Sequence, residues 1–152
     1  AAIGADAGID PALLDDAKWE RIADLAQAVA TGAHTLATLD PVTVAAPGVK
    51  IGDDGEPGGH TAAQVQGFID ADTQTYRNMA NTLADHAGSL ATAARAKDVV
   101  ATGQLVGELD AVCEACHLNF WYPEQRDLMN QYLPGGAAEA TGGAAAATPA
   151  SN

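Results

Sequence analysis

The two cysteines of the chain lie three residues apart and are followed directly by a histidine, in the sequence Cys113-Glu114-Ala115-Cys116-His117. This C-x-x-C-H spacing is the attachment signature of c-type haem. The two thiols can add across the two vinyl groups of the porphyrin as thioethers, and the histidine can then reach the iron from one side. Residues three and four apart share one face of a helix. The motif therefore predicts one covalent haem c, held by Cys113 and Cys116, with His117 as the proximal ligand of the iron.

Two other kinds of site use a similar cysteine pair. A thioredoxin-like redox pair needs a strand that leads into the helix, and the sequence offers no strand pattern before Cys113. A zinc site needs four ligands, whereas only two thiolates and His117 are local. Two buried cysteines beside an ordinary histidine form the plain structural alternative. Haem attachment is favoured because it uses both cysteines of the chain and fits a helical context.

The elements that hold this motif are expected to be helices. Hydrophobic residues make up 47% of the 152 residues, but aromatic residues only 5%. The apolar content is therefore mostly alanine, leucine and valine. Alanine and leucine are strong helix formers, and residues that favour strands are scarce. The length predicts a single domain, and the composition disfavours an all-β fold.

The charge of the chain narrows the range of partners. Seven Lys and Arg residues against 20 Asp and Glu residues give a formal net charge of −13. An acidic surface repels phosphate, so nucleic acids and anionic membranes are disfavoured partners. Membrane insertion is also not expected, because no apolar run approaches the roughly 18 residues that span a bilayer. The chain begins without a signal-peptide pattern, and we expect that a signal peptide has already been removed.

The sequence predicts four helices within a domain of residues 10–134. Asp10 and Pro11 open the first helix, which is expected to run to residue 39. Its predicted apolar face consists of Leu14, Ile22, Leu25, Val29, Ala33 and Leu36. Residues 40–60 are rich in proline and glycine and are expected to form a long loop that covers or lines a site. Thr61 and Gln64 form a capping box for a short second helix.

The later helices are delimited by similar signals. Asp72 can cap a third helix that carries Tyr76, Met79, Leu83, Leu90 and Ala94 on its apolar face. Lys97 and Asp98 mark a break, and the last long helix runs from residue 99 to about residue 120, before Pro123. Residues 128–133 are expected to add one or two further turns. Residues 1–9 are expected to be frayed, and residues 135–152 to form a flexible tail of alanine and glycine.

These elements predict an all-α fold, an antiparallel four-helix bundle with a C-terminal haem-binding helix. A C-x-x-C-H motif in the last long helix of an acidic, alanine-rich bundle resembles the class II cytochromes c, the cytochrome c prime group. The stretch from Val112 to Pro123, with Trp121 and Tyr122, also resembles small bacterial monohaem proteins that carry an aromatic pair after the motif. The resemblance implies an up-down bundle, export to the periplasm or outside the cell before haem attachment, and a possible homodimer through the first helices.

The resemblance also sets expectations for the far side of the iron. Low-spin members of the class place a methionine of the first helix there, whereas high-spin members place an apolar or aromatic residue. The two methionines of this chain, Met79 and Met129, lie outside the first helix. The matching stretch offers instead Trp19, Ile22, Ala23 and Ala26. We therefore expect a largely five-coordinate ferric iron, with residues near Ile22 facing it and Met79 packed against the haem.

Other side chains complete the expected site. First-helix arginines often bind the haem propionates in this class, which implies this role for Arg21, with Lys18 nearby; a pair of solvated charges is the alternative. Phe120 is expected to shield the haem from water together with Leu109 and Val112. Trp121 and Tyr122 either cover the exposed haem edge or close the end of the bundle. A bis-histidine site remains an alternative to the open iron, and its candidate ligands are His34, His60 and His86.

Two functions remain after these steps. The first is a one-electron carrier that docks, through its acidic surface, on basic patches of larger redox partner proteins. The alternative is a gas-binding haem protein with an open iron beneath an apolar lid. An enzymatic role is set aside, because peroxidase-like chemistry needs a distal acid–base residue and none is clearly placed.

Overall fold

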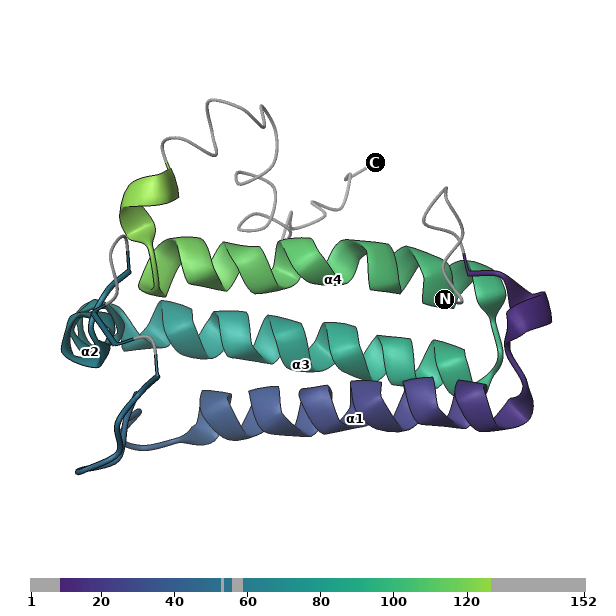
Figure 1. Cartoon of the computed structure of the whole chain (residues 1–152), viewed down its shortest axis with the longest axis horizontal. Coiled ribbons are helices and arrows are strands. Elements are labelled where there is room, and N and C mark those ends of the chain that lie inside the picture. The colour runs from purple at the N-terminus through teal and green to yellow at the C-terminus, as the bar shows by residue number, and fades with distance from the viewer. Residues whose placement is uncertain (1–8, 53, 56–58, 127–152) are drawn as a thin grey trace, which may run out of the picture.

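The computed structural model describes residues 9–52, 54, 55 and 59–126, and it is all-helical over these ranges (Figure 1). Four α-helices follow one another, α1 (Asp16–Thr38), α2 (Ala62–Ala71), α3 (Thr73–Arg95) and α4 (Val99–Phe120), with short 3₁₀ turns at Pro11–Leu13 and Pro123–Gln125. No strand occurs in the described ranges. The predicted all-α class is confirmed, and the arrangement is compatible with a helical bundle. The expectations for residues 1–8, 128–133 and 135–152 lie outside the described residues.

Three of the four helices begin where the sequence predicts. Thr61 and Gln64 form the reciprocal capping box at the start of α2. The Asp72 carboxylate accepts a hydrogen bond from Thr75 N (3.1 Å) at the start of α3, and Asp98 accepts one from Ala101 N (3.0 Å) at the start of α4. Such side chains satisfy backbone N–H groups that have no partner within the helix. These short-range hydrogen bonds explain why the boundaries could be read from sequence.

The start of the first helix differs from the prediction. Asp10 accepts a hydrogen bond from Ala12 N (2.9 Å), but it opens only the 3₁₀ turn Pro11–Leu13. Leu14 is extended, and α1 begins after Asp15, which accepts a hydrogen bond from Lys18 N (2.9 Å). The chain thus has two successive aspartate caps, and the second one starts the long helix.

The order of the helices in space follows from the shortness of α2. Lys97 Nζ lies 2.8 Å from Asp16 Oδ1, which joins the end of α3 to the start of α1. Arg77 Nη2 donates to Leu39 O (2.7 Å), which joins the start of α3 to the end of α1. Helix α4 then returns along the other side of α3, while α2 lies across one end (Figure 1). Because α2 is too short to run the length of the other helices, α1 and α4 point in the same direction.

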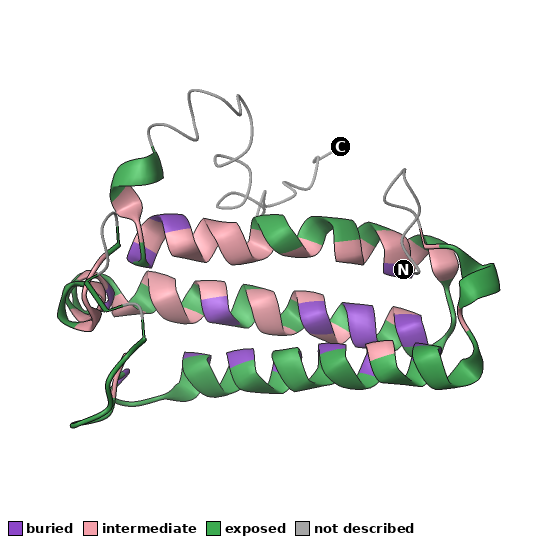
Figure 2. Ribbon diagram, in the orientation of Figure 1, coloured by how far each residue is buried: buried purple, intermediate pink, exposed green. Residues whose placement is uncertain are grey.

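The contact between α1 and α3 is built mainly from alanine. The buried residues of α1 are Trp19, Ala23, Ala26, Ala30, Ala33 and Ala37, and those of α3 are Ala80, Ala87, Leu90, Ala91 and Ala94. Small side chains let two helix axes approach closely. In Figure 2 the buried residues of α1 accordingly form a narrow line facing α3.

The predicted apolar face of the first helix is wrong for three of its six residues, although Ala33 is buried as predicted. Leu25, Val29 and Leu36 are 56%, 43% and 42% exposed, respectively. Leu25 and Val29 are not covered by α4, because α4 packs against the opposite side of α3. The face of α3 was predicted correctly, since its large residues are buried or half-buried.

Enlarging one alanine of this contact should destabilise the fold. Ala23 is 0% exposed, so Ala23→Leu would force the two helices apart. We expect a loss of about 1–3 kcal/mol in the free energy of unfolding, the usual cost of overpacking. Ala28→Leu is the matched control, because Ala28 is exposed on the same helix. Denaturant unfolding of both variants checks this, and equal effects would contradict the close alanine contact.

Candidate functional site

A cavity of about 500 Å³ lies at the end of the molecule where α2 crosses the longer helices. Its walls come from the last turns of α1, the following loop, α2, the first half of α3 and the end of α4. Most of the lining side chains are apolar, among them Leu36, Val65, Ile69 and Leu83. A cavity of this size and character suits a small-molecule or cofactor site.

Helix α4 brings the whole C-x-x-C-H motif to this cavity. Cys113, Cys116 and His117 all line the cavity. They do so together because residues three and four apart lie on the same face of a helix. Both thiols are free and partly buried. Cys116 also packs against a buried cluster that includes Phe120 and Ile69. The local sequence therefore places the three side chains together, as predicted.

The surroundings of the thiols do not resemble those of a reactive cysteine pair. Burial raises the pKa of the Cys113 thiol, and the charges of Asp110 and Glu114 raise it further. Burial, followed by the neighbouring Cys113, raises the pKa of Cys116. Redox-active and nucleophilic cysteines instead have a lowered pKa, because the thiolate is the reactive form. The protonated thiols argue against a thioredoxin-like pair.

A zinc site also finds no support. Within residues 9–52, 54, 55 and 59–126, no group of three or more histidine, cysteine, aspartate or glutamate side chains is arranged to hold a metal ion. A structural zinc ion takes four such ligands. The cysteine pair and His117 thus lack a fourth ligand within the described chain.

One acidic and two aromatic side chains surround the imidazole of His117. Its Nδ1 lies 3.6 Å from Glu114 Oε2, an ion-pair distance. Tyr122 Oη donates a hydrogen bond of 2.7 Å to the same oxygen, and burial together with this bond raises the pKa of Tyr122 to about 12. The Trp121 ring meets the imidazole edge-on, with centroids 5.1 Å apart. With Nδ1 turned to the carboxylate, Nε2 is the nitrogen left for another partner.

Two further expected residues lie in the same cavity as the motif. Met79 and Phe120 both line the cavity. Phe120 is buried and meets Tyr76 edge-on, with ring centroids 5.5 Å apart. The Met79 sulfur accepts a hydrogen bond from Asn119 Nδ2 at 3.7 Å. Trp121 also lines the cavity and is 48% exposed, at the boundary with solvent.

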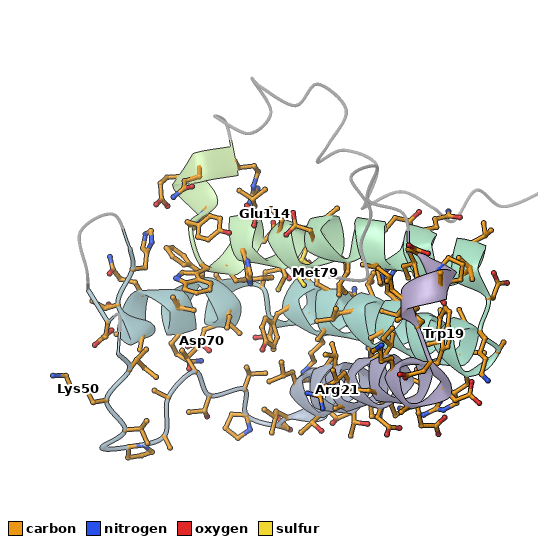
Figure 3. The ribbon with its side chains drawn as sticks, turned by 45° about the vertical axis from the view of Figure 1, so that its right-hand side comes forward. Trp19, Arg21, Lys50, Asp70, Met79 and Glu114 are labelled. Atoms are coloured by element: carbon orange, nitrogen blue, oxygen red, sulfur yellow. The ribbon has the colours of Figure 1, made fainter. Side chains whose placement is uncertain are left out.

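The structure does not bring Trp19, Arg21 and Ile22 to the cavity, which corrects the expectation that they face the haem. Trp19 is buried against Ala23 and Ala94, and Ile22 packs against the same cluster, close to the start of α4. Arg21 is exposed on α1. In Figure 3, Trp19 lies at the right-hand end, whereas Met79 and Glu114 lie further towards α2.

The physical reason is the shared direction of α1 and α4. In an up-down bundle of four long helices, the start of the first helix lies beside the end of the last. Here the end of α1 takes that place, and it contributes Ala33, Leu36 and Leu39 to the cavity. Sequence reasoning missed these residues, although the shortness of the predicted second helix was the signal that could have identified them.

The loop between α1 and α2 forms the remaining wall, in agreement with the expectation that it lines a site. Val42, Val44 and Ile51 face the cavity, and so does His60 at the end of the loop. The other candidate histidines lie elsewhere. His34 is exposed on α1, and His86 Nε2 lies 2.8 Å from Leu105 O.

Comparison of the chain with protein-family models, curated proteins and solved structures finds no match. The resemblance to the class II cytochromes c therefore stays a prediction. Among the described residues, no helix is long and apolar enough to cross a membrane.

Proposed function

We propose that the chain is a c-type monohaem cytochrome that acts as a one-electron carrier, with α4 as its haem-binding helix. The observation that carries the proposal is the meeting of both thiols and the His117 imidazole in one largely apolar cavity. These residues fit the group that the motif implies. The free thiols can form thioethers, an apolar wall can cover a porphyrin face, and imidazole is a common haem ligand.

Attachment uses the two cysteines without an external oxidant. Each thiol would add across one vinyl C=C bond, so that a C–S bond and a C–H bond would form while the S–H bond and the π bond would be lost. In this addition the thiol hydrogen of each cysteine would pass to the vinyl carbon that does not bond to sulfur. The two residues would therefore anchor the haem at the end of α4.

The remaining residues would hold and shield the group. When bound, a haem supplies one iron that changes between the ferric and ferrous states. His117 would offer Nε2, with Nδ1 kept towards Glu114. Phe120 and Met79 would cover part of a porphyrin face, and the half-exposed Trp121 lies on a side of the cavity that meets solvent. That side is the proposed place of electron exchange with a partner.

The proposal is tested on the protein expressed with an export signal and a haem-attachment system. After acid–acetone extraction, the intact mass should retain one haem. A redox titration should follow a reversible one-electron curve, about 59 mV per tenfold change in the ratio of the two states. Electron exchange with a basic redox protein should slow as salt is added, because the net charge is −13. A mass equal to the bare polypeptide would refute the proposal.

A further inference from the structure

His60, the histidine of the loop between α1 and α2, lines the same cavity as the C-x-x-C-H motif. We propose that His60 is the sixth ligand of the haem iron, so that the site is bis-histidine and not five-coordinate as expected from the sequence; this inference rests on the proposed haem. His60 ends the loop between α1 and α2 and lines the cavity that holds Cys113, Cys116 and His117. One face of the cavity thus carries the attachment motif, and the loop contributes a second imidazole.

The first observation is a buried ring nitrogen without a partner. The His60 side chain is only 16% exposed, and its Nδ1 is buried without a hydrogen-bond partner among the residues that the structure describes. Buried polar atoms are nearly always paired, so an unpaired one calls for an explanation. The loop residues that line the cavity include the polar Thr43 and Asp54, but neither is a hydrogen-bond partner of His60 Nδ1. Coordination to the proposed haem iron would give this nitrogen a partner.

The second observation is a carboxylate on the other ring nitrogen. His60 Nε2 lies 3.5 Å from Glu124 Oε2, and the ring meets Phe68 edge-on with centroids 5.1 Å apart. Metal-bound histidines usually direct their second nitrogen to a carboxylate, a carbonyl or water, which fixes the orientation of the ring. His117 has the same arrangement, with Nδ1 3.6 Å from Glu114. Both histidines of the cavity therefore have one ring nitrogen next to a carboxylate, as metal-bound histidines often do.

Met79 is the competing ligand, because it also lines the cavity. Its sulfur, however, already accepts a hydrogen bond from Asn119 Nδ2 at 3.7 Å. His60 Nδ1 has no such partner within the described chain. The loop histidine is therefore favoured over the methionine, and a closed iron with two imidazoles suits electron transfer better than gas binding.

The test compares three variants of the haem-loaded protein with the wild type. His60→Ala removes the proposed ligand, Met79→Leu removes the competitor, and His34→Ala makes the same chemical change at an exposed site. Electron paramagnetic resonance of the ferric wild type should show a dominant low-spin signal. His60→Ala should lose this signal and become high-spin with its covalent haem retained, and added imidazole should restore the low-spin state. Met79→Leu and His34→Ala should stay low-spin.

Each other outcome overturns the inference in a recognisable way. A high-spin wild type would mean an open site, and a low-spin signal lost only in Met79→Leu would make Met79 the ligand. Should His60→Ala fail to fold, pulsed resonance on the wild type decides instead, because nitrogen couplings distinguish one bound imidazole from two. Haem retained on the chain with one coordinated imidazole contradicts only this inference, whereas a wild type without covalent haem also refutes the proposed function.

Discussion

Replacing both cysteines, Cys113→Ser and Cys116→Ser, should abolish covalent haem. A serine hydroxyl does not form the thioether that the thiol forms with a vinyl group, so no bond would hold the haem through extraction. Both cysteines line the cavity and are only partly buried, and serine has nearly the same size. The helices should therefore persist. Intact mass after acid–acetone extraction measures the loss, and far-ultraviolet circular dichroism reports the helices.

The single variants provide the internal control for this loss. Cys113→Ser and Cys116→Ser, made separately, should each keep one thioether, and each should retain some haem in the intact mass. Complete retention of haem in the double variant would show that the attachment does not use the C-x-x-C-H motif. Loss of both helix and haem in the double variant would show that the cysteines are needed for folding. The single variants would then decide whether the thiols hold the haem.

The substitution His117→Ala should have the second largest effect. It removes the only imidazole within the motif while both thioethers remain, so we expect a protein with covalent haem but a strongly altered spectrum and reduction potential. Loss of a hydrogen-bond partner behind a ligand already weakens metal sites by about 10–100-fold. Loss of the ligand itself should exceed that effect. Optical spectra and a redox titration of the purified holoprotein measure the change.

The matched control for this variant is His34→Ala, the same change on an exposed face of α1. It should leave the spectrum and the potential of the wild type in place. Added imidazole should enter the space left in His117→Ala and bring the spectrum back towards the wild type. An unchanged spectrum in His117→Ala would show that another residue is the proximal ligand.

The sequence predicted those features that depend on residues close together in the chain. Thr61, Asp72 and Asp98 cap helices through hydrogen bonds to residues three positions on, so their roles follow from spacing alone. The shared face of Cys113, Cys116 and His117 follows from the helical period in the same way. Met79 and Phe120 line the same cavity as the motif because they lie on the apolar faces of the helices that enclose it.

The contacts of the first helix could not be read in the same manner. Hydrophobic periodicity favours large apolar residues such as Leu25 and Val29, yet close packing against α3 selected the alanines beside them. The position of Trp19 depended on the direction of α1 relative to α4, which is set by the length of α2 rather than by any residue of α1. The residues of α1 carry no signal of this long-range geometry, and the sequence indicates it only through the shortness of the predicted second helix.

The walls of the cavity belong to separate stretches of the sequence, and this separation bears on how such a site can change. The end of α4 carries the attachment motif, whereas the loop after α1 supplies the wall with His60. The loop takes no part in the alanine contact between α1 and α3. Substitutions at His60 can therefore vary the chemistry of the cavity while the motif on α4 is kept, whereas the loop residue Val42 packs with Ile69 and Phe120 and supports the fold. For the proposed haem protein, natural or designed variants could thus acquire a different sixth ligand by a change in one connecting segment.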